Sequence, residues 1–488
     1  MIIVLLLLIP LLSACILPFV KEKPGQFALM ASLAELAVAA VAAFQFIPNS
    51  SIQFAIDQPW IPSLGINFYM GIDGISLMMV LLTTFLTPLI ILSALNREYK
   101  NPSAFYALIM LMQVGLIGVF ISLNGLLFYI FWELALIPIY FIAAFWGGKK
   151  SIPATFKFFI YTIFGSFFML IALIYLYFQT PGDHSFTWQA FSTLHLDRAT
   201  QGCLFWAFFV AFAIKLPIFP FHTWQPDTYT EAPTPGTMLL AGIMLKMGIY
   251  GIIRWMLPIL PLGLQDYGKT AIILSVIGIV YASIIAIQQK DFKRLIAFSS
   301  IAHVGLIAAG IFAFSQQSIE GSIMQMLSHG VNAVGLFFIA DIIFSRTQTN
   351  TISSLGGIIN SAPKFAILFS IIMFGTIALP LTNGFWGEFL LLMGVFQYNA
   401  CLGVISGLTV ILGAVYMLRS YQKIMLGENN ALTKDVTDLT MNEKAVLVPI
   451  VIMVIWMGLN PEFFMHFARP AVENIMSIAG SSGLIGIK

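Results

Sequence analysis

Long runs of apolar residues recur along the whole 488-residue chain, and they limit its possible folds more than any other feature. A helix that crosses a bilayer needs about 20 apolar residues, because the hydrocarbon offers no water to bond the backbone. Apolar residue types make up 59% of the chain and charged types only 9%, far below the roughly 25% of an ordinary soluble domain. The chain is therefore predicted to be an all-α polytopic membrane protein.

Fourteen segments are long and apolar enough to be membrane spans: 2–20, 27–47, 73–95, 103–122, 125–146, 155–179, 203–230, 235–257, 268–288, 295–314, 322–343, 363–397, 402–424 and 444–466. Proline interrupts the seventh at Pro217 and Pro220, and the twelfth at Pro380. Since proline has no N–H, Pro217 should leave the carbonyl of Ala213 without its helical partner. Helices 7 and 12 are therefore predicted to be broken. The first segment is interpreted as a retained span, because no basic residue precedes it as in a signal peptide.

The distribution of Lys and Arg predicts the orientation of these segments. Loops after odd-numbered segments, with the adjoining span ends, hold sixteen of the 23 basic residues: Lys21, Lys23, Arg97, Lys100, Lys149, Lys150, Lys157, Lys290, Lys293, Arg294, Arg346, Lys364, Arg419, Lys423, Lys434 and Lys444. Loops after even-numbered segments hold only Arg198, Arg254 and Lys269. Cytoplasmic loops carry the excess of Lys and Arg, so both termini are predicted to face the periplasm of a bacterial inner membrane.

Two sets of five segments have similar lengths and a similar internal order. Segments four to eight cover 103–257, segments nine to thirteen cover 268–424, and the fourth segment of each set is the broken one. An odd number of crossings inverts the second set relative to the first, as in many transporter folds. The predicted divisions are 1–102 for N-terminal helices 1–3, 103–257 for the first inverted repeat, 258–424 for the second, and 425–488 for a C-terminal loop and helix 14.

Six ionisable side chains within the predicted spans form the candidate site: Glu133, Lys215, Lys246, His303, His329 and Glu388. A charge at the bilayer centre costs about 2.5–3.5 kcal/mol on insertion scales, so such residues usually mark an ion or proton path. Lys215 precedes the break at Pro217, and Glu388 follows the break at Pro380. Glu133 and Lys215 are predicted to form a pair, with Lys246 as the next station.

Structural roles are open for several of these residues. Glu133 could be a protonated hydrogen-bonding carboxyl, or its pair with Lys215 could be a static brace. A single histidine on an apolar helix usually makes a structural hydrogen bond, whereas two on successive helices suit a proton relay as well. Glu35 and Asp341 are assigned structural or subunit-contact roles.

Cofactor and nucleic-acid chemistry have no support in the sequence. Cys15, Cys203 and Cys401 are isolated, so they cannot supply the four thiolates of an iron–sulfur cluster. Neither a Gly-rich nucleotide loop nor a His/Asp/Glu cluster with metal-ligand spacing is present. No cofactor, metal or nucleic acid is therefore predicted to bind this chain.

Five stretches around the candidate site carry a family resemblance: FWELALIPIYFI, AFAIKLPIFPFHTWQPDTYTEAPTPGTMLLAGIMLKMGIYGIIRW, DFKRLIAFSSIAHVGLI, MLSHGVNAVGLFF and NGFWGEFL. They resemble the antiporter-like subunits of respiratory complex I, and among these the M-type subunits of bacterial NADH–quinone oxidoreductase. The resemblance implies a fourteen-helix proton-pumping subunit whose relay is the six candidate residues. It also implies NADH, FMN, iron–sulfur clusters and quinone in partner subunits, and the antiporter-like chains L and N as neighbours. Those chains place lysine where this chain has Glu388.

Two other functions fit the same residues. A subunit of a multi-component sodium/proton antiporter would share the fold but would depend on sodium and lack NADH-linked activity. A passive scaffold that only holds neighbouring subunits together would leave the buried charges dispensable.

Overall fold

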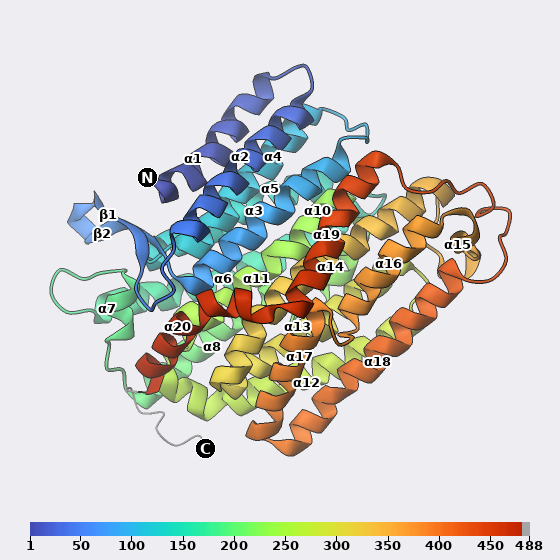
Figure 1. Ribbon diagram of the computed structural model, residues 1–488. Coiled ribbons are helices and arrows are strands. Elements are labelled where there is room, and N and C mark those ends of the chain that lie inside the picture. The colour runs from blue at the N-terminus through green and yellow to red at the C-terminus, as the bar shows by residue number, and fades with distance from the viewer. Residues whose placement is uncertain (481–488) are drawn as a thin grey trace.

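The computed structural model describes residues 1–480, and long helices dominate it (Figure 1). Twelve helices in this described part are long and apolar enough to cross a membrane. Eleven of them are α1 (Ile2–Ile16, extended to Phe19 by the short helix η1), α2 (Pro24–Gln45), α3 (Gly74–Ala94), α4 (Pro102–Ile121), α5 (Gly125–Trp146), α6 (Ser151–Gln179), α12 (Pro261–Gln288), α13 (Phe292–Ala313), α14 (Gln316–Thr347), α18 (Ala400–Met425) and α19 (Met441–Leu459).

The twelfth candidate span is a composite helix that covers Thr234–Met256. It consists of α10 (Thr234–Leu239), the π-helical turn η3 (Leu240–Met244), α11 (Leu245–Gly251) and a second π-helical turn, η4 (Ile252–Met256). Its apolar stretch is buried throughout, like that of α13. Lys246 therefore lies on a short α-helical piece between two π turns, a distortion that is frequent at functional sites.

Both proline-containing segments are interrupted. α8 (Arg198–Lys215) ends at Lys215 and α9 begins after Pro217 and Pro220 (Trp224–Glu231). The expected free carbonyl of Ala213 is not free, because the Ile218 N–H donates to it at 2.9 Å. The break thus satisfies this carbonyl by a wider turn, in which the hydrogen bond spans five residues instead of four.

The second interruption lies between α16 (Pro363–Thr376) and α17 (Asn383–Tyr398). Ala378 (φ +56°) and Leu381 (φ +72°) flank Pro380 in the left-handed region. Side chains rarely adopt this conformation outside constrained sites. If α8 with α9 and α16 with α17 each make one crossing, these two crossings and the twelve candidate spans add up to the predicted fourteen. The count of fourteen stays a prediction.

The expectation of an all-α chain is wrong for the segment between α2 and α3. β1 (Gln53–Ile61) and β2 (Ile66–Ile72) form an antiparallel hairpin in which Asp57 pairs with Tyr69. β-branched and aromatic residues on both sides of a Pro- and Gly-containing turn are a hairpin pattern. The segment is too polar to span a membrane, so a criterion of long apolar runs does not identify it.

The predicted last span, 444–466, is also wrong at its C-terminal end. α19 stops at Leu459, and Pro461 begins a separate helix, α20 (Pro461–Ala479). α20 is not among the candidate spans and crosses the bundle obliquely (Figure 1). Its Phe467 backbone lies against Gly74 at the start of α3, where no side chain would fit. The last eight residues of the predicted division 425–488 lie outside the described residues.

The short elements gather at the two ends of the helices. The hairpin, α7 (Trp188–Ser192) and α20 lie at the end where α1 begins, and α15 (Ile358–Ser361) lies at the other (Figure 1). The short helices η2 (Pro62–Leu64) and η5 (Ile352–Ser354) complete the chain. The composite helix, α13 and α14 are buried almost throughout, whereas α2, α6 and α18 expose much of their surface. These three buried helices form the core, and buried charged residues of the predicted site are expected there.

Candidate functional site

The six candidate residues come from six different elements and all but one are buried. Glu133 lies on α5, Lys215 at the end of α8, Lys246 on α11, His303 on α13, His329 on α14 and Glu388 on α17. The last five are at most 6% exposed. Glu133 is only half-buried. The inward faces of the helices thus bring most of the candidate site into the protein interior.

Glu133 and Lys215 do not touch. Among residues 1–480 no ion pair joins them, and both Glu133 Oε1 and Lys215 Nζ lack a hydrogen-bond partner within the protein. Lys215 Nζ instead lies 5.1 Å from the ring centroid of Trp132, the residue before Glu133. This is within the range of a cation–π interaction. The two side chains therefore do not form the predicted ion pair in this structure.

Lys246 contacts a histidine of the other half of the chain. Its Nζ lies 2.8 Å from His329 Nδ1 and donates to the Ala241 carbonyl oxygen at 2.7 Å. The other ring nitrogen, His329 Nε2, lies 2.9 Å from Ser300 Oγ. The two helices can approach because Gly330 has no side chain: a Cβ there would lie only 2.8 Å from a carbonyl of the composite helix.

His303 and Glu388 form a second buried contact. His303 Nδ1 lies 2.8 Å from Glu388 Oε1, which also accepts a hydrogen bond from Gln325 Nε2 at 3.2 Å. Each group is thereby held by a polar partner, as buried titratable groups require. His303 Nε2 and Glu388 Oε2 have no hydrogen-bond partner within the described protein.

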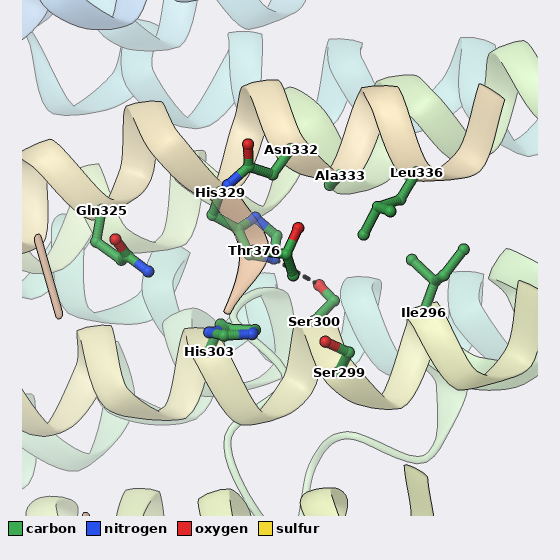
Figure 2. A pocket seen from close by; sticks show the side chains of 10 residues that line it. All are labelled: Ile296, Ser299, Ser300, His303, Gln325, His329, Asn332, Ala333, Leu336 and Thr376. Carbon is green, nitrogen blue, oxygen red and sulfur yellow. Dashed lines mark hydrogen bonds between the residues drawn. The ribbon is translucent and has the colours of Figure 1, made fainter. Parts of the chain in front are cut away.

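A small cavity separates the two histidine pairs. The volume in which the centre of a water molecule fits is about 20 Å³, which is enough for one water. Figure 2 shows His329 on α14 and His303 with Ser300 on α13 around this space, with the imidazole centroids 6.5 Å apart. Its full lining is Ile296, Ser299, Ser300, His303, Gln325, His329, Asn332, Ala333, Leu336 and Thr376. Lys246, His329, His303 and Glu388 thus form a line with one water-sized gap.

Lys215 has no direct contact with Lys246 in the described part of the chain, but their elements lie close together. Gly248, two residues after Lys246, lies against α8, and a Cβ built there would be 3.3 Å from the Cβ of Lys215. The two helices are therefore in contact here, but the side chains of Lys215 and Lys246 are not. The first half of the predicted path is less continuous than the second.

The sequence interpretation missed a buried ion pair. Arg254, assigned to a loop, lies in η4 and pairs with Asp73, the residue that caps α3 by accepting from the Ser76 N–H at 2.9 Å. The Arg254 Nε–H donates to Tyr250 Oη at 3.2 Å. The opposite charges of Asp73 and Arg254 offset the loss of hydration that each side chain undergoes on burial. The signal was present, since Arg254 falls within the apolar segment 235–257.

Asp341, assigned to a contact role, lies at the end opposite the hairpin. Its carboxylate accepts from the Arg97 guanidinium at 2.7 Å and from Thr234 Oγ1 at 2.7 Å. Glu35 accepts from Gln113 Nε2 at 2.5 Å on the outer helices α2 and α4. Both contacts are away from the line between Lys246 and Glu388.

Comparison with known proteins gives the family. The model described as "NADH-ubiquinone oxidoreductase chain 4, amino terminus" matches residues 1–121, and the model "NADH:quinone oxidoreductase/Mrp antiporter, TM" matches residues 122–413. The NADH-quinone oxidoreductase subunit M of Rickettsia prowazekii is 43% identical over 88% of this chain and 88% of that protein. This chain belongs to the M-type subunits of NADH–quinone oxidoreductase. The subunit M of Rhodobacter capsulatus is 38% identical over 96% of this chain and 95% of its own length.

A solved structure agrees with this assignment. A chain of respiratory complex I from Thermus thermophilus with bound NADH aligns with a TM-score of 0.91 at 27% identity, over 98% of this M-type subunit and 100% of that chain. The M-type subunit is thus a proton-translocating membrane subunit of an NADH:quinone oxidoreductase, with other membrane subunits as partners. The second family model covers Mrp antiporters too, but the N-terminal model favours the oxidoreductase.

Proposed function

We propose that this subunit moves protons along Lys246, His329, His303 and Glu388, and that Glu133 and Lys215 supply this line. The observation that carries the proposal is the continuity of the line: two direct contacts of 2.8 Å, joined by one water-sized cavity. Neutral imidazole has one donor and one acceptor nitrogen, so it can take a proton on one side and release it on the other.

The proton would pass from the Lys246 ammonium to His329 Nδ1, while the proton on His329 Nε2 moves toward Ser300 and the cavity. A water there would deliver it to His303 Nε2, which has no other partner in the described protein. His303 Nδ1–H then donates to Glu388 Oε1. Glu388 Oε2, also without a partner, is the group from which the proton would leave.

Glu133 and Lys215 would control when a proton reaches this line. With the two side chains apart, burial disfavours the charged lysine; when they meet, each charge stabilises the other. Lys215 could therefore bind and release a proton as the distance to Glu133 changes. The separation of the two groups in the structure supports a pair that forms and breaks rather than a fixed brace.

Moving one charge against 100 mV takes about 2.3 kcal/mol, and this energy must come from partner subunits. We propose that NADH, FMN, the iron–sulfur clusters and quinone bind there, with no redox centre in this chain. Chains L and N are the proposed membrane neighbours.

The proposed topology has fourteen crossings, with inverted repeats at 103–257 and 258–424. Both termini are proposed to face the periplasm of a bacterial inner membrane. The distribution of basic residues supports this orientation. The start of α1 and the helix α20 lie at one end of the bundle, as the proposed placement on the same side of the membrane requires (Figure 1).

The test replaces Lys246 by Met in the intact complex. NADH-driven proton uptake into inverted membrane vesicles is measured with a pH-sensitive dye and normalised to assembled complex. Uptake should fall at least fivefold. The control Lys269→Met removes an exposed lysine of α12 and should leave uptake unchanged.

Full uptake in Lys246→Met would contradict the relay and favour a scaffold. A strict requirement for sodium in wild-type vesicles would favour the antiporter alternative.

A further inference from the structure

A second, larger cavity lies beside the relay at the end of the protein that carries most of the basic loops. The volume in which the centres of water molecules fit is about 370 Å³. The cavity lies between the C-terminal ends of α12 and α18. Its lining includes the exposed Lys290, Arg419 and Lys423, so the cavity opens onto the surface. We call it the basic vestibule. None of the relay residues lines it.

One buried hydrogen bond connects the basic vestibule with the relay. Tyr416 of α18 lines the vestibule, and its Oη lies 3.0 Å from Ser299 Oγ of α13. Ser299 lines the water-sized cavity together with Ser300, His303 and His329, as Figure 2 shows. Tyr416 is 1% exposed and Ser299 is 2% exposed. The two side chains thus form the partition between a cavity open to the surface and the interior of the relay.

We propose that Tyr416 and Ser299 are the proton gate between the basic vestibule and the relay. The inference deepens the proposed function and rests on it. Phenol and hydroxyl groups can each donate and accept a hydrogen bond, so a proton can cross the partition without opening a water channel. Tyr416 and Ser299 thereby form a second entry to the relay, which admits a proton at the cavity between His329 and His303, in addition to the supply through Lys246.

The transfer conserves every proton at the gate. A water in the vestibule takes up a proton from the water outside and donates one of its own to Tyr416 Oη, as the Tyr416 O–H bond breaks and its proton moves to Ser299 Oγ. The Ser299 hydroxyl passes its own proton to the water in the relay cavity, and both side chains end neutral. One proton has then moved from the vestibule to the histidines, and rotation of the two hydroxyls resets the gate.

The charge of the vestibule adds selectivity. Lys290, Arg419 and Lys423 repel metal cations, which lowers the local sodium concentration at the partition. A proton is less affected, because it crosses as a shift of O–H bonds and no cation has to reside between the lysines. The vestibule and gate together therefore suit proton transport rather than sodium transport.

The experiment removes single oxygen atoms. Tyr416→Phe and Ser299→Ala should each lower NADH-driven proton uptake in inverted vesicles at least threefold per assembled complex, toward the level of Lys246→Met. Ser299→Thr keeps the hydroxyl and should retain most of the uptake. The matched control is Tyr421→Phe, because Tyr421 lies on the same helix, donates to the Ala366 carbonyl at 3.2 Å and lines neither cavity.

If the Tyr416–Ser299 hydrogen bond only held α13 against α18, blocking the vestibule would not change proton uptake. A second measurement therefore tests the vestibule itself. Lys423→Cys, in a background with Cys15, Cys203 and Cys401 replaced by Ser, is labelled with a membrane-impermeant methanethiosulfonate. Labelling should reduce uptake, and a reductant should restore it. Lys364→Cys, an exposed position at the same end but outside the vestibule, should show no block.

The outcomes separate the gate from the relay. Wild-type uptake in Tyr416→Phe, or in fully labelled Lys423→Cys, with loss in Lys246→Met would overturn the gate and leave the relay standing. Wild-type uptake in Lys246→Met would overturn both. Loss in Tyr416→Phe and Ser299→Ala with retention in Ser299→Thr and a reversible block at position 423 would support the gate.

Discussion

Removing one member of the Asp73–Arg254 pair should destabilise the protein far more than removing one member of an exposed pair. Only 5% of the Asp73 side chain and 3% of the Arg254 side chain are exposed. Arg254→Met leaves the Asp73 carboxylate buried without its counterion. Breaking a buried pair in this way costs about 3–5 kcal/mol. Since about 1.4 kcal/mol corresponds to a factor of ten, the folding equilibrium constant should fall roughly 10²- to 10⁴-fold.

The surroundings of the pair decide whether a second change compensates. Arg254 also bonds Tyr250 and lies 5.6 Å from the Trp188 ring centroid, so its loss removes more than one contact. Asp73→Asn keeps an oxygen that can cap α3. When both charges are removed, no unpaired charge stays buried. The double variant Asp73→Asn/Arg254→Met should therefore be more stable than Arg254→Met alone.

The assay heats the purified complex stepwise and follows, on native gels, the temperature at which this subunit is lost. Arg198→Met is the matched control, because Arg198 pairs with Asp266 at 2.6 Å but is 59% exposed. Water competes for such a pair, so its loss should change little. The reasoning would be refuted if Arg254→Met were as stable as Arg198→Met, or if the double variant were no better than Arg254→Met.

Three further predictions concern the path and the topology. Glu133→Ala should abolish proton uptake in membranes that still contain assembled complex, because it removes the only carboxylate proposed to meet Lys215; undiminished uptake would contradict the switchable pair. Glu388→Lys should retain part of the uptake and Glu388→Gln should lose most of it, because glutamine cannot exchange a proton in this range; a Gln variant that pumps normally would show a structural role. Cysteines at positions 23 and 290, both exposed, should be protected from an external label, whereas a cysteine at 198 should react; the reverse pattern would invert the proposed topology.

Much of the helical architecture could be predicted from the sequence because one physical constraint dominates it. Runs of about 20 apolar residues leave few alternatives to spanning helices, and prolines at Pro217 and Pro380 lie where the helices are interrupted. The hairpin of β1 and β2 could not be found by that criterion, since its signal is an alternating pattern in a polar segment. The boundary at Pro461 was missed because the apolar composition continues past the proline into α20.

The candidate site was predictable in its members but not in its contacts. Buried charges in apolar runs stand out in a sequence, and this identified Lys246, His329 and Glu388. Which of them touch depends on helix packing, for example on Gly330 allowing α14 to approach the composite helix. Ser299 and Tyr416 carry no such signal, because serine and tyrosine are common on membrane helices. Only the cavities on either side of them make their contact meaningful.

In the proposed relay, the two halves differ in how well their side chains are connected, and this difference predicts where transport is controlled. In the proposed relay, two contacts and one cavity already connect Lys246 with Glu388, so we expect this half to need a water and a proton rather than a change of conformation. Lys215, in contrast, has no hydrogen bond to Glu133 or to Lys246 among the described residues, although α8 lies against α11 at Gly248. A small movement at the break after Lys215 would move its ammonium between these two partners. If the proposed relay holds, energy from the neighbouring subunits needs to act on this break, and the second half responds to the charge that arrives at Lys246.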